Sequence, residues 1–141
     1  MIPSAEEFLR LRQSREESEY TRAGAEEAPF EVWLAVIEKY PGMRRWVPIN
    51  KTVPLEILAM LARDGDPSVR AAVADRRRLN AELFDALSLD EDEFVRSRVA
   101  ANKKAPFEIV LRLAEDPAAH VRSIAQRRLT QMHPPRKPCQ T

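Results

Sequence analysis

An internal repeat with a period of 26 residues constrains the fold of this chain more than any other feature. The pairs Val69-Arg70, Val95-Arg96 and Val121-Arg122 are 26 residues apart. The same spacing relates four more positions, which hold Glu56, Glu82 and Glu108; Leu61, Leu87 and Leu113; Asp64, Asp90 and Asp116; and Val73, Val99 and Ala125. A period of this length is typical of solenoids and repeat arrays, in which each copy buries its apolar face against its neighbours.

A fourth and more divergent copy precedes these three. Met43-Arg44 stands 26 residues before Val69-Arg70, and the interval from Pro29 to Pro54 is one residue shorter than the period. The repeats therefore run over residues 29–50, 54–77, 80–103 and 106–129. Divergence is expected of a terminal copy, because only one of its faces meets a neighbour.

Each copy predicts two short helices. The first helix starts at a Pro or Asn, where a missing N–H or a capping side chain suits the first turn, namely at Pro29, Pro54, Asn80 and Pro106. The second follows an acidic turn, such as residues 64–67 or 115–117, where Asp is expected as the N-cap and Pro as the first helical residue. Helices of about eight to ten residues are too short to be stable alone in water, so stacking must stabilise them.

The segments that flank the repeats have different compositions. Ser4 and Glu7 form a capping box that opens a helix with Phe8, Leu9 and Leu11 on its apolar side. We expect residues 1–28 to be a helical cap or linker, residues 29–129 the helical-repeat solenoid, and the Pro-rich residues 130–141 a disordered tail.

Composition narrows the class of protein further. Three glycines and 6% aromatic residues favour helix over sheet, and a lone cysteine, Cys139, cannot supply a disulfide or a zinc cage within the chain. No signal segment and no long apolar run occur, so we expect a cytoplasmic protein without a membrane span. A net charge of +1 gives no global attraction to nucleic acid. The predicted fold is all-α: a short right-handed α-solenoid of about four two-helix repeats (period 26) with an N-terminal helical cap.

The segments at residues 64–74 and 90–100, with an Asp-containing turn before Val-Arg and a small-residue helix, resemble the leucine-rich repeat variant family and the broader HEAT-like repeats. The resemblance covers about 100 of the 141 residues and implies a superhelix, found in small bacterial proteins, that binds protein or, less often, nucleic acid. A founding member of the family carries an iron–sulfur cluster on an N-terminal group of cysteines. This chain has no cysteine there, so the cluster is not implied, and we expect no cofactor and no metal.

Four arginines recur at one repeat position. They could hold phosphates or acidic peptides, because a guanidinium pairs with such groups through two hydrogen bonds. Internal pairing is the favoured interpretation, since Asp66 and Asp92 lie four residues before Arg70 and Arg96. We therefore predict a structural ladder that ties neighbouring copies together, made of Arg44, Arg70, Arg96, Arg122, Asp64, Asp90 and Asp116.

A basic edge is expected at the ends of the second helices, opposite the acidic turns, at Asn50-Lys51, Arg76-Arg77-Arg78, Asn102-Lys103-Lys104 and Arg127-Arg128. These cations would offset the helix dipoles. The three successive arginines at residues 76–78 are more than helix capping needs, so binding of an anionic partner is an open alternative. Trp46, whose slot holds Ala72, Arg98 and Ile124 in the other copies, either covers the end of the stack or forms a binding hot spot. The candidate partner-binding residues are Arg45, Trp46, Asn50, Arg76, Arg77, Arg78, Arg98, Asn102, Lys103 and Lys104.

Catalytic motifs are absent from the sequence. His120 has no second His or Cys near it, and no Gly-rich phosphate loop occurs, so we predict no enzyme and no catalytic residue. The favoured function is a non-catalytic protein–protein interaction module, an adaptor or scaffold whose concave face holds a partner. The alternative is a HEAT-like module that binds nucleic acid along the basic edge. A monomer or weak homo-oligomer is expected, and no membrane partner.

Overall fold

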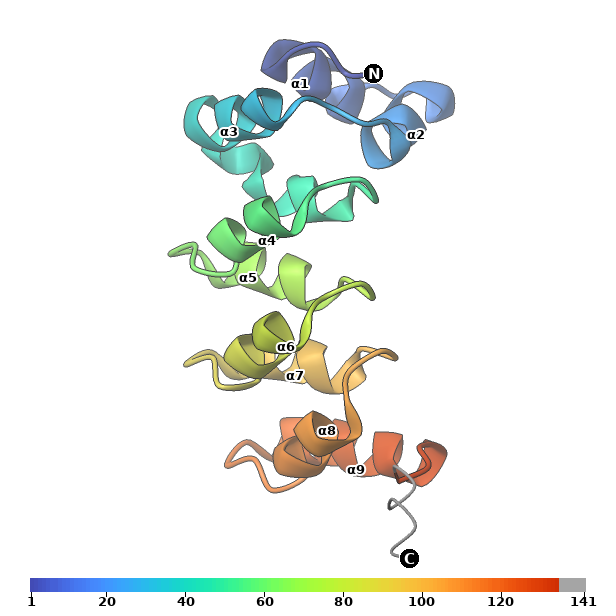
Figure 1. The fold of residues 1–141 in the computed structure, drawn as a ribbon, viewed down its shortest axis with the longest axis vertical. Helices are drawn as coiled ribbons and strands as arrows, with labels where there is room; N and C mark the ends of the chain where they lie inside the picture. Colours follow the sequence, from blue (N-terminus) through green and yellow to red (C-terminus); the bar gives the residue numbers. More distant parts are fainter. Residues whose placement is uncertain (135–141) are drawn as a thin grey trace, which may run out of the picture. The chain divides into compact units, whose positions relative to one another are not determined.

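The computed structural model describes residues 1–134, and the regular secondary structure within this range consists of helices joined by turns and loops. The chain forms two compact units, unit 1 (Met1–Arg76) and unit 2 (Arg77–Thr141). Figure 1 labels the α-helices of each unit in chain order. Unit 1 contains α1 (Ala5–Gln13), α2 (Glu17–Ala25), α3 (Phe30–Lys39), the 3₁₀ helix η1 (Pro41–Ile49), α4 (Leu55–Leu61) and α5 (Pro67–Ala74). Unit 2 contains α6 (Ala81–Ser88), α7 (Glu93–Ala101), α8 (Phe107–Leu113) and α9 (Ala119–Gln131).

Helix starts follow the 26-residue spacing of the sequence. The first helices of three copies begin at Leu55, Ala81 and Phe107, and the second helices begin at Pro67, Glu93 and Ala119. The predicted start signals Pro29, Pro54, Asn80 and Pro106 are the N-cap residues of α3, α4, α6 and α8. At Asn80 the side chain accepts a hydrogen bond from the Leu83 N–H at 2.9 Å, which satisfies one of the free donors of the first turn.

The acidic turns cap the second helices in two copies and not in the third. Asp66 and Asp92 are the N-caps of α5 and α7, and each accepts a hydrogen bond from the N–H two residues ahead. The N-cap of α9 is Ala118, so the expectation that Asp116 and Pro117 would start this helix is corrected. Asp116 occupies the turn position before the cap, where its carboxylate accepts from the Ala118 N–H at 2.9 Å.

In unit 1, helix α1 of the N-terminal segment packs on α3, the first helix of the first repeat. Ser4 caps α1 by accepting from the Glu7 N–H at 3.1 Å, as the capping box predicts. Phe8 and Trp33 are fully buried, and their rings meet edge to face with 5.4 Å between centroids. Trp33 is therefore a core residue of unit 1.

The second helix of the first copy differs from those of the other copies. The sequence predicts an α-helix there, but residues 41–49 form η1, a 3₁₀ helix with Pro48 inside it. Proline has no N–H to give to the carbonyl four residues back, and its ring clashes with that carbonyl, so a regular α-helix is disfavoured at this point. Val47 and Pro48 are nevertheless buried, so η1 still contributes to the core of unit 1.

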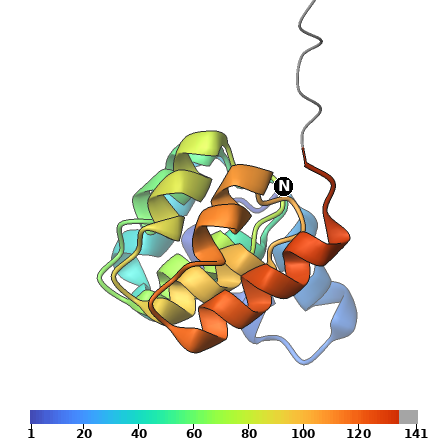
Figure 2. The same cartoon turned by 90° about the horizontal axis from the view of Figure 1, so that it is seen from below.

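In unit 2, α9 packs along both α7 and α8, and Figure 2 shows the adjacent helices from below. The buried positions are the repeated apolar ones, among them Leu87, Val95, Val99, Leu113 and Val121. Helix α9 continues to Gln131, so Thr130 and Gln131 are helical and do not belong to the predicted tail. Residues 135–141 of that tail lie outside the described range.

Candidate interaction surfaces

The recurrent arginines make the same backbone contact in three copies. Arg70, Arg96 and Arg122 each donate through Nη1 to the carbonyl of the residue six positions earlier, at 2.8, 2.8 and 2.7 Å. These carbonyls belong to Asp64, Asp90 and Asp116. Each guanidinium thus holds the turn that precedes its own helix.

Side-chain pairing in the predicted ladder joins successive copies. Within unit 2, Arg96 donates to both carboxylate oxygens of Asp116, at 2.8 and 3.1 Å. Within unit 1, Arg44 donates to one oxygen of Asp64 at 3.3 Å. Arg96 turns to Asp116 and not to Asp92, so the expected pair of Arg96 with Asp92, four residues apart, is corrected.

The charge of Asp116 is stabilised by these contacts. Burial by itself would raise the pKa of its carboxyl, but hydrogen bonds from Arg96 and from the Ala118 N–H outweigh burial, and the pKa lies below its ordinary value. The hydrogen bond to Asp116 likewise raises the pKa of Arg96. Both groups stay ionised at neutral pH, and neither is poised to exchange a proton in catalysis.

Two predicted partner-binding residues are buried. Asn50 is 0% exposed and donates to the carbonyls of Ala23 and Glu26, at 2.8 and 2.9 Å. Asn102 is 6% exposed, and its carboxamide oxygen accepts from the Lys104 N–H at 2.9 Å. The expectation that Asn50 and Asn102 contact a partner is therefore corrected, because both side chains are buried and hydrogen-bonded to backbone groups of the chain itself.

Two arginines of the basic edge are also used inside the chain. Arg76 donates to the carbonyls of Asn50 and Lys51 within unit 1, at 3.0 and 3.3 Å. Arg128 donates to the Lys103 carbonyl within unit 2, at 3.3 Å. This contact brings the end of α9 beside the loop that follows α7.

The other cations of the basic edge are exposed, and we call them the free basic residues. Their side chains make no ion pair or hydrogen bond with the part of the chain that the structure describes. Five belong to unit 2, and Lys51 belongs to unit 1. The five are Arg77, Arg78, Lys103, Lys104 and Arg127.

Trp46 lies against a residue that the sequence did not single out. The guanidinium carbon of Arg12, in the last turn of α1, is 4.1 Å from the centroid of the indole ring, and that of Arg45 is 4.9 Å away. The ring is half-buried. Arg12 lies outside the repeats, so the 26-residue period carried no signal for this contact. Arg98, at the Trp46 position of a later copy, instead lies 5.7 Å from the ring of Phe94.

Unit 2 also contains a hollow of about 350 Å³ next to the ladder. Arg96 and Asp116 line it as a pair, and Arg112 bonds to Asp85 and to the hydroxyl of Ser88. Its arginines are therefore already bound to other side chains, and no His or Cys lines it. Three large apolar side chains of this unit, Leu89, Phe94 and Leu111, are at least half exposed.

Among residues 1–134, no group of three His, Cys, Asp or Glu side chains could hold a metal ion. No described helix is both long and apolar enough to cross a bilayer. None of the protein families, curated proteins or solved structures compared with the chain matches it.

Proposed function

We propose that this protein is a non-catalytic interaction module, a short right-handed α-solenoid of the leucine-rich repeat variant or HEAT-like type, whose concave face and basic edge bind a protein partner. One observation carries the proposal. Arginines at the recurrent repeat position are bonded within the chain, whereas the free basic residues of unit 2 have no acidic partner in the described range. Charges that do not stabilise the fold are available to a second molecule.

The partner surface is expected to be acidic. Lys103 and Lys104 follow α7, and the bond from Arg128 to the Lys103 carbonyl puts the end of α9 next to them. Exposed cations speed association with an acidic surface and fix its orientation. The half-exposed Leu89, Phe94 and Leu111 supply apolar contact area on the same unit.

Two experiments test this proposal in sequence. Proteins captured from the native host by the full chain are identified, and the leading one is purified and titrated by calorimetry. The double variant Lys103→Glu/Lys104→Glu is expected to lose binding, and Arg15→Glu, an exposed arginine of unit 1, is the matched control. Direct binding that both variants retain equally would contradict the proposal.

Nucleic acid is the second candidate, and the adjacent cation pairs Arg77-Arg78 and Lys103-Lys104 favour it. Retention on DNA would then weaken steeply with salt, because each phosphate contact releases counterions. A log–log salt slope near zero would exclude this candidate. A steep slope that falls in Lys103→Glu/Lys104→Glu would support it over the protein partner.

The solenoid itself is supported by two regularities. Helix starts keep the 26-residue interval from unit 1 into unit 2, at Leu55 and Ala81 and at Pro67 and Glu93. The contact from an arginine to the aspartate 20 residues later occurs in both units, as Arg44 to Asp64 and as Arg96 to Asp116.

A further inference from the structure

Two positively charged guanidinium groups, those of Arg12 and Arg45, lie against the indole ring of Trp46. Arg12 comes from α1 and Arg45 from η1, so two separate segments of unit 1 bring their guanidiniums to one ring. The two guanidinium carbons can be no farther apart than the sum of 4.1 and 4.9 Å, their distances to the ring centroid. Cation–π attraction holds each of them there, although the two charges repel each other.

Neither guanidinium has an acidic partner within the described residues. Arg10, two residues before Arg12, shows the contrast, because it pairs with Glu7 and Glu19 at 2.7 and 2.8 Å. Arg45 acts on Asp66 only at longer range, as a weaker cause of that carboxyl's lowered pKa than the bonds from Ser68. Burial lowers the pKa of Arg12, so a bound anion would relieve the cost of burying its charge.

The arrangement favours an anion with two charges. A guanidinium over an aromatic ring uses its flat face, and its N–H groups remain available at its edges for bidentate hydrogen bonds to an oxyanion. A phosphate monoester carries about −1.5 to −2 charges at neutral pH, so it matches two arginines. A carboxylate or a phosphodiester carries a single negative charge and matches only one.

We propose that Arg12, Arg45 and Trp46 form a binding site for the terminal phosphate group of a phosphorylated ligand. Among the four copies only the first has this site, because the others hold Ala71-Ala72, Ser97-Arg98 and Ser123-Ile124 at the positions of Arg45 and Trp46. It lies in unit 1 and uses none of the free basic residues of unit 2. The site can therefore exist whether or not the proposed function is correct.

Nuclear magnetic resonance of the full chain tests the site. Inorganic phosphate and O-phosphoserine are titrated at constant ionic strength while the indole N–H signals are followed, and Trp46→Phe assigns the signal of Trp46. Both probes are expected to shift the Trp46 signal in a saturable way and to leave the buried Trp33 signal unchanged. Arg12→Gln and Arg45→Gln are each expected to weaken binding by about tenfold, from the loss of charge-assisted hydrogen bonds.

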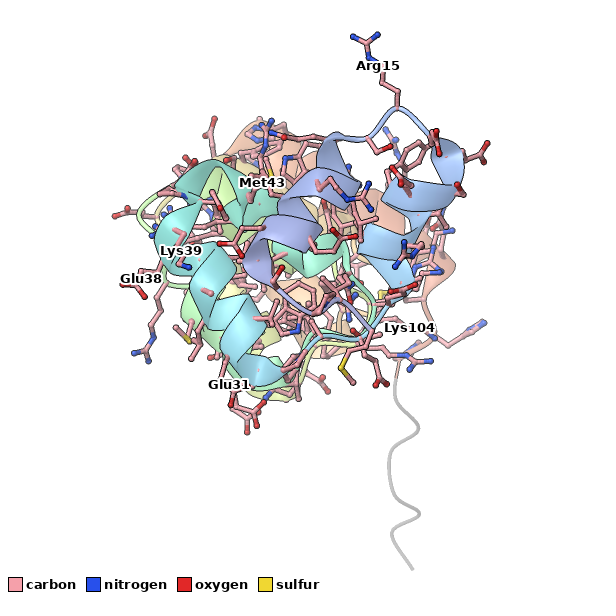
Figure 3. The ribbon with its side chains drawn as sticks, turned by 90° about the horizontal axis from the view of Figure 1, so that it is seen from above. Arg15, Glu31, Glu38, Lys39, Met43 and Lys104 are labelled. Atoms are coloured by element: carbon pink, nitrogen blue, oxygen red, sulfur yellow. The ribbon has the colours of Figure 1, made fainter. Side chains whose placement is uncertain are left out.

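The matched control is Arg15→Gln. Figure 3 shows Arg15 pointing away from the ribbon between α1 and α2, and the residue is exposed. This variant is expected to bind the probes as the wild type does, and an equal loss in Arg15→Gln and Arg45→Gln would overturn the proposal. Because Arg45 is exposed, Arg45→Gln is expected to stay folded even if Arg12→Gln does not.

Two further titrations set the chemical class. Chloride at matched ionic strength is expected to cause no saturable shift, and an equal response to chloride would overturn the site. A single-stranded oligonucleotide without a terminal phosphate is expected to bind more weakly than O-phosphoserine. Tighter binding of that oligonucleotide would overturn the assignment to a terminal phosphate.

Discussion

The same repeat positions form a tight ion pair in one unit and a loose one in the other. In unit 2, Arg96 meets Asp116 through two hydrogen bonds, and their side chains are 14% and 5% exposed. In unit 1, Arg44 meets Asp64 through one bond of 3.3 Å, and the exposed fractions are 31% and 11%. The repeat position determines which residues meet, but not how closely they meet.

Helix type explains the difference. Arg96 projects from an α-helix, so its Nε and Nη2 atoms both reach Asp116. Arg44 projects from the 3₁₀ helix η1, and its Nε donates instead to the Ile37 carbonyl at 2.8 Å. Of its two terminal nitrogens only Nη1 donates to Asp64, so this pair is weaker and more exposed to water.

The largest expected effect comes from breaking the tight pair. Asp116→Ala leaves the largely buried guanidinium of Arg96 without its carboxylate partner, with only the bond to the Asp90 carbonyl in place, and is expected to cost about 3 kcal/mol of unfolding free energy. Asp64→Ala is expected to cost about 1 kcal/mol, because Arg44 is more exposed and keeps its bond to Ile37. Urea unfolding followed by circular dichroism measures both, and equal costs would refute the comparison.

Unit 1 has its own buried polar contact in Asn50. Asn50→Ala removes both donors to the carbonyls of Ala23 and Glu26 and is expected to destabilise the protein by about 2 kcal/mol. Tryptophan fluorescence during urea unfolding suits this measurement, since Trp33 and Trp46 both lie in unit 1. Thr52→Ala, which removes a hydroxyl that donates to the Asn50 side-chain oxygen at 2.6 Å but leaves the two bonds from Asn50 to the carbonyls, is the control and is expected to cost less.

Acid is expected to weaken the tight pair through Asp116. The pKa of Asp116 is lower in the folded chain than in the unfolded chain, where an Asp carboxyl has a pKa of about 3.9. The stabilisation is therefore complete above the unfolded value and is lost as the pH falls through the folded one, below about pH 4. The stability difference between wild type and Asp116→Asn should shrink over that range, and a constant difference down to pH 2 would contradict the lowered pKa.

The smallest expected effect on stability lies outside both pairs. Lys103→Ala/Lys104→Ala removes exposed side chains without partners and should change the unfolding free energy by at most about 0.5 kcal/mol. A thermal melt checks this. A loss above about 2 kcal/mol would show that these lysines stabilise the fold and are not reserved for a partner.

Local signals in the sequence were sufficient to predict many elements of the fold. Pro54 and Asn80 mark helix starts because a missing N–H or a capping side chain acts within one turn. The repeat pattern alone predicts an α-helix over residues 41–49, whereas Pro48 within that segment disfavours one. Contacts between distant segments, such as Arg12 on Trp46, follow from packing and leave no periodic trace.

The buried asparagines show a second limit of the sequence. Asn50 and Asn102 stand among basic residues at helix ends, and this setting favoured a polar, exposed interpretation. Each side chain instead satisfies backbone groups of nearby loops. A carboxamide can form hydrogen bonds with a partner or with the backbone of a buried turn. The residue type alone does not distinguish these roles, which depend on how the surrounding chain packs.

Positions 50, 76, 102 and 128 alternate between Asn and Arg, which has a consequence for the construction of longer chains. Each asparagine accepts a hydrogen bond from an N–H of its own loop, and Asn50 also donates to the carbonyls of Ala23 and Glu26. The arginines donate to carbonyls 25 or 26 residues earlier and accept nothing. At this position the same residue type therefore returns only after two copies, or 52 residues. Inserting a duplicated pair preserves the alternation, whereas inserting a single copy places two like residues in succession. An array extended by pairs should fold with the greater cooperativity, which makes the pair the natural building block for engineering this protein.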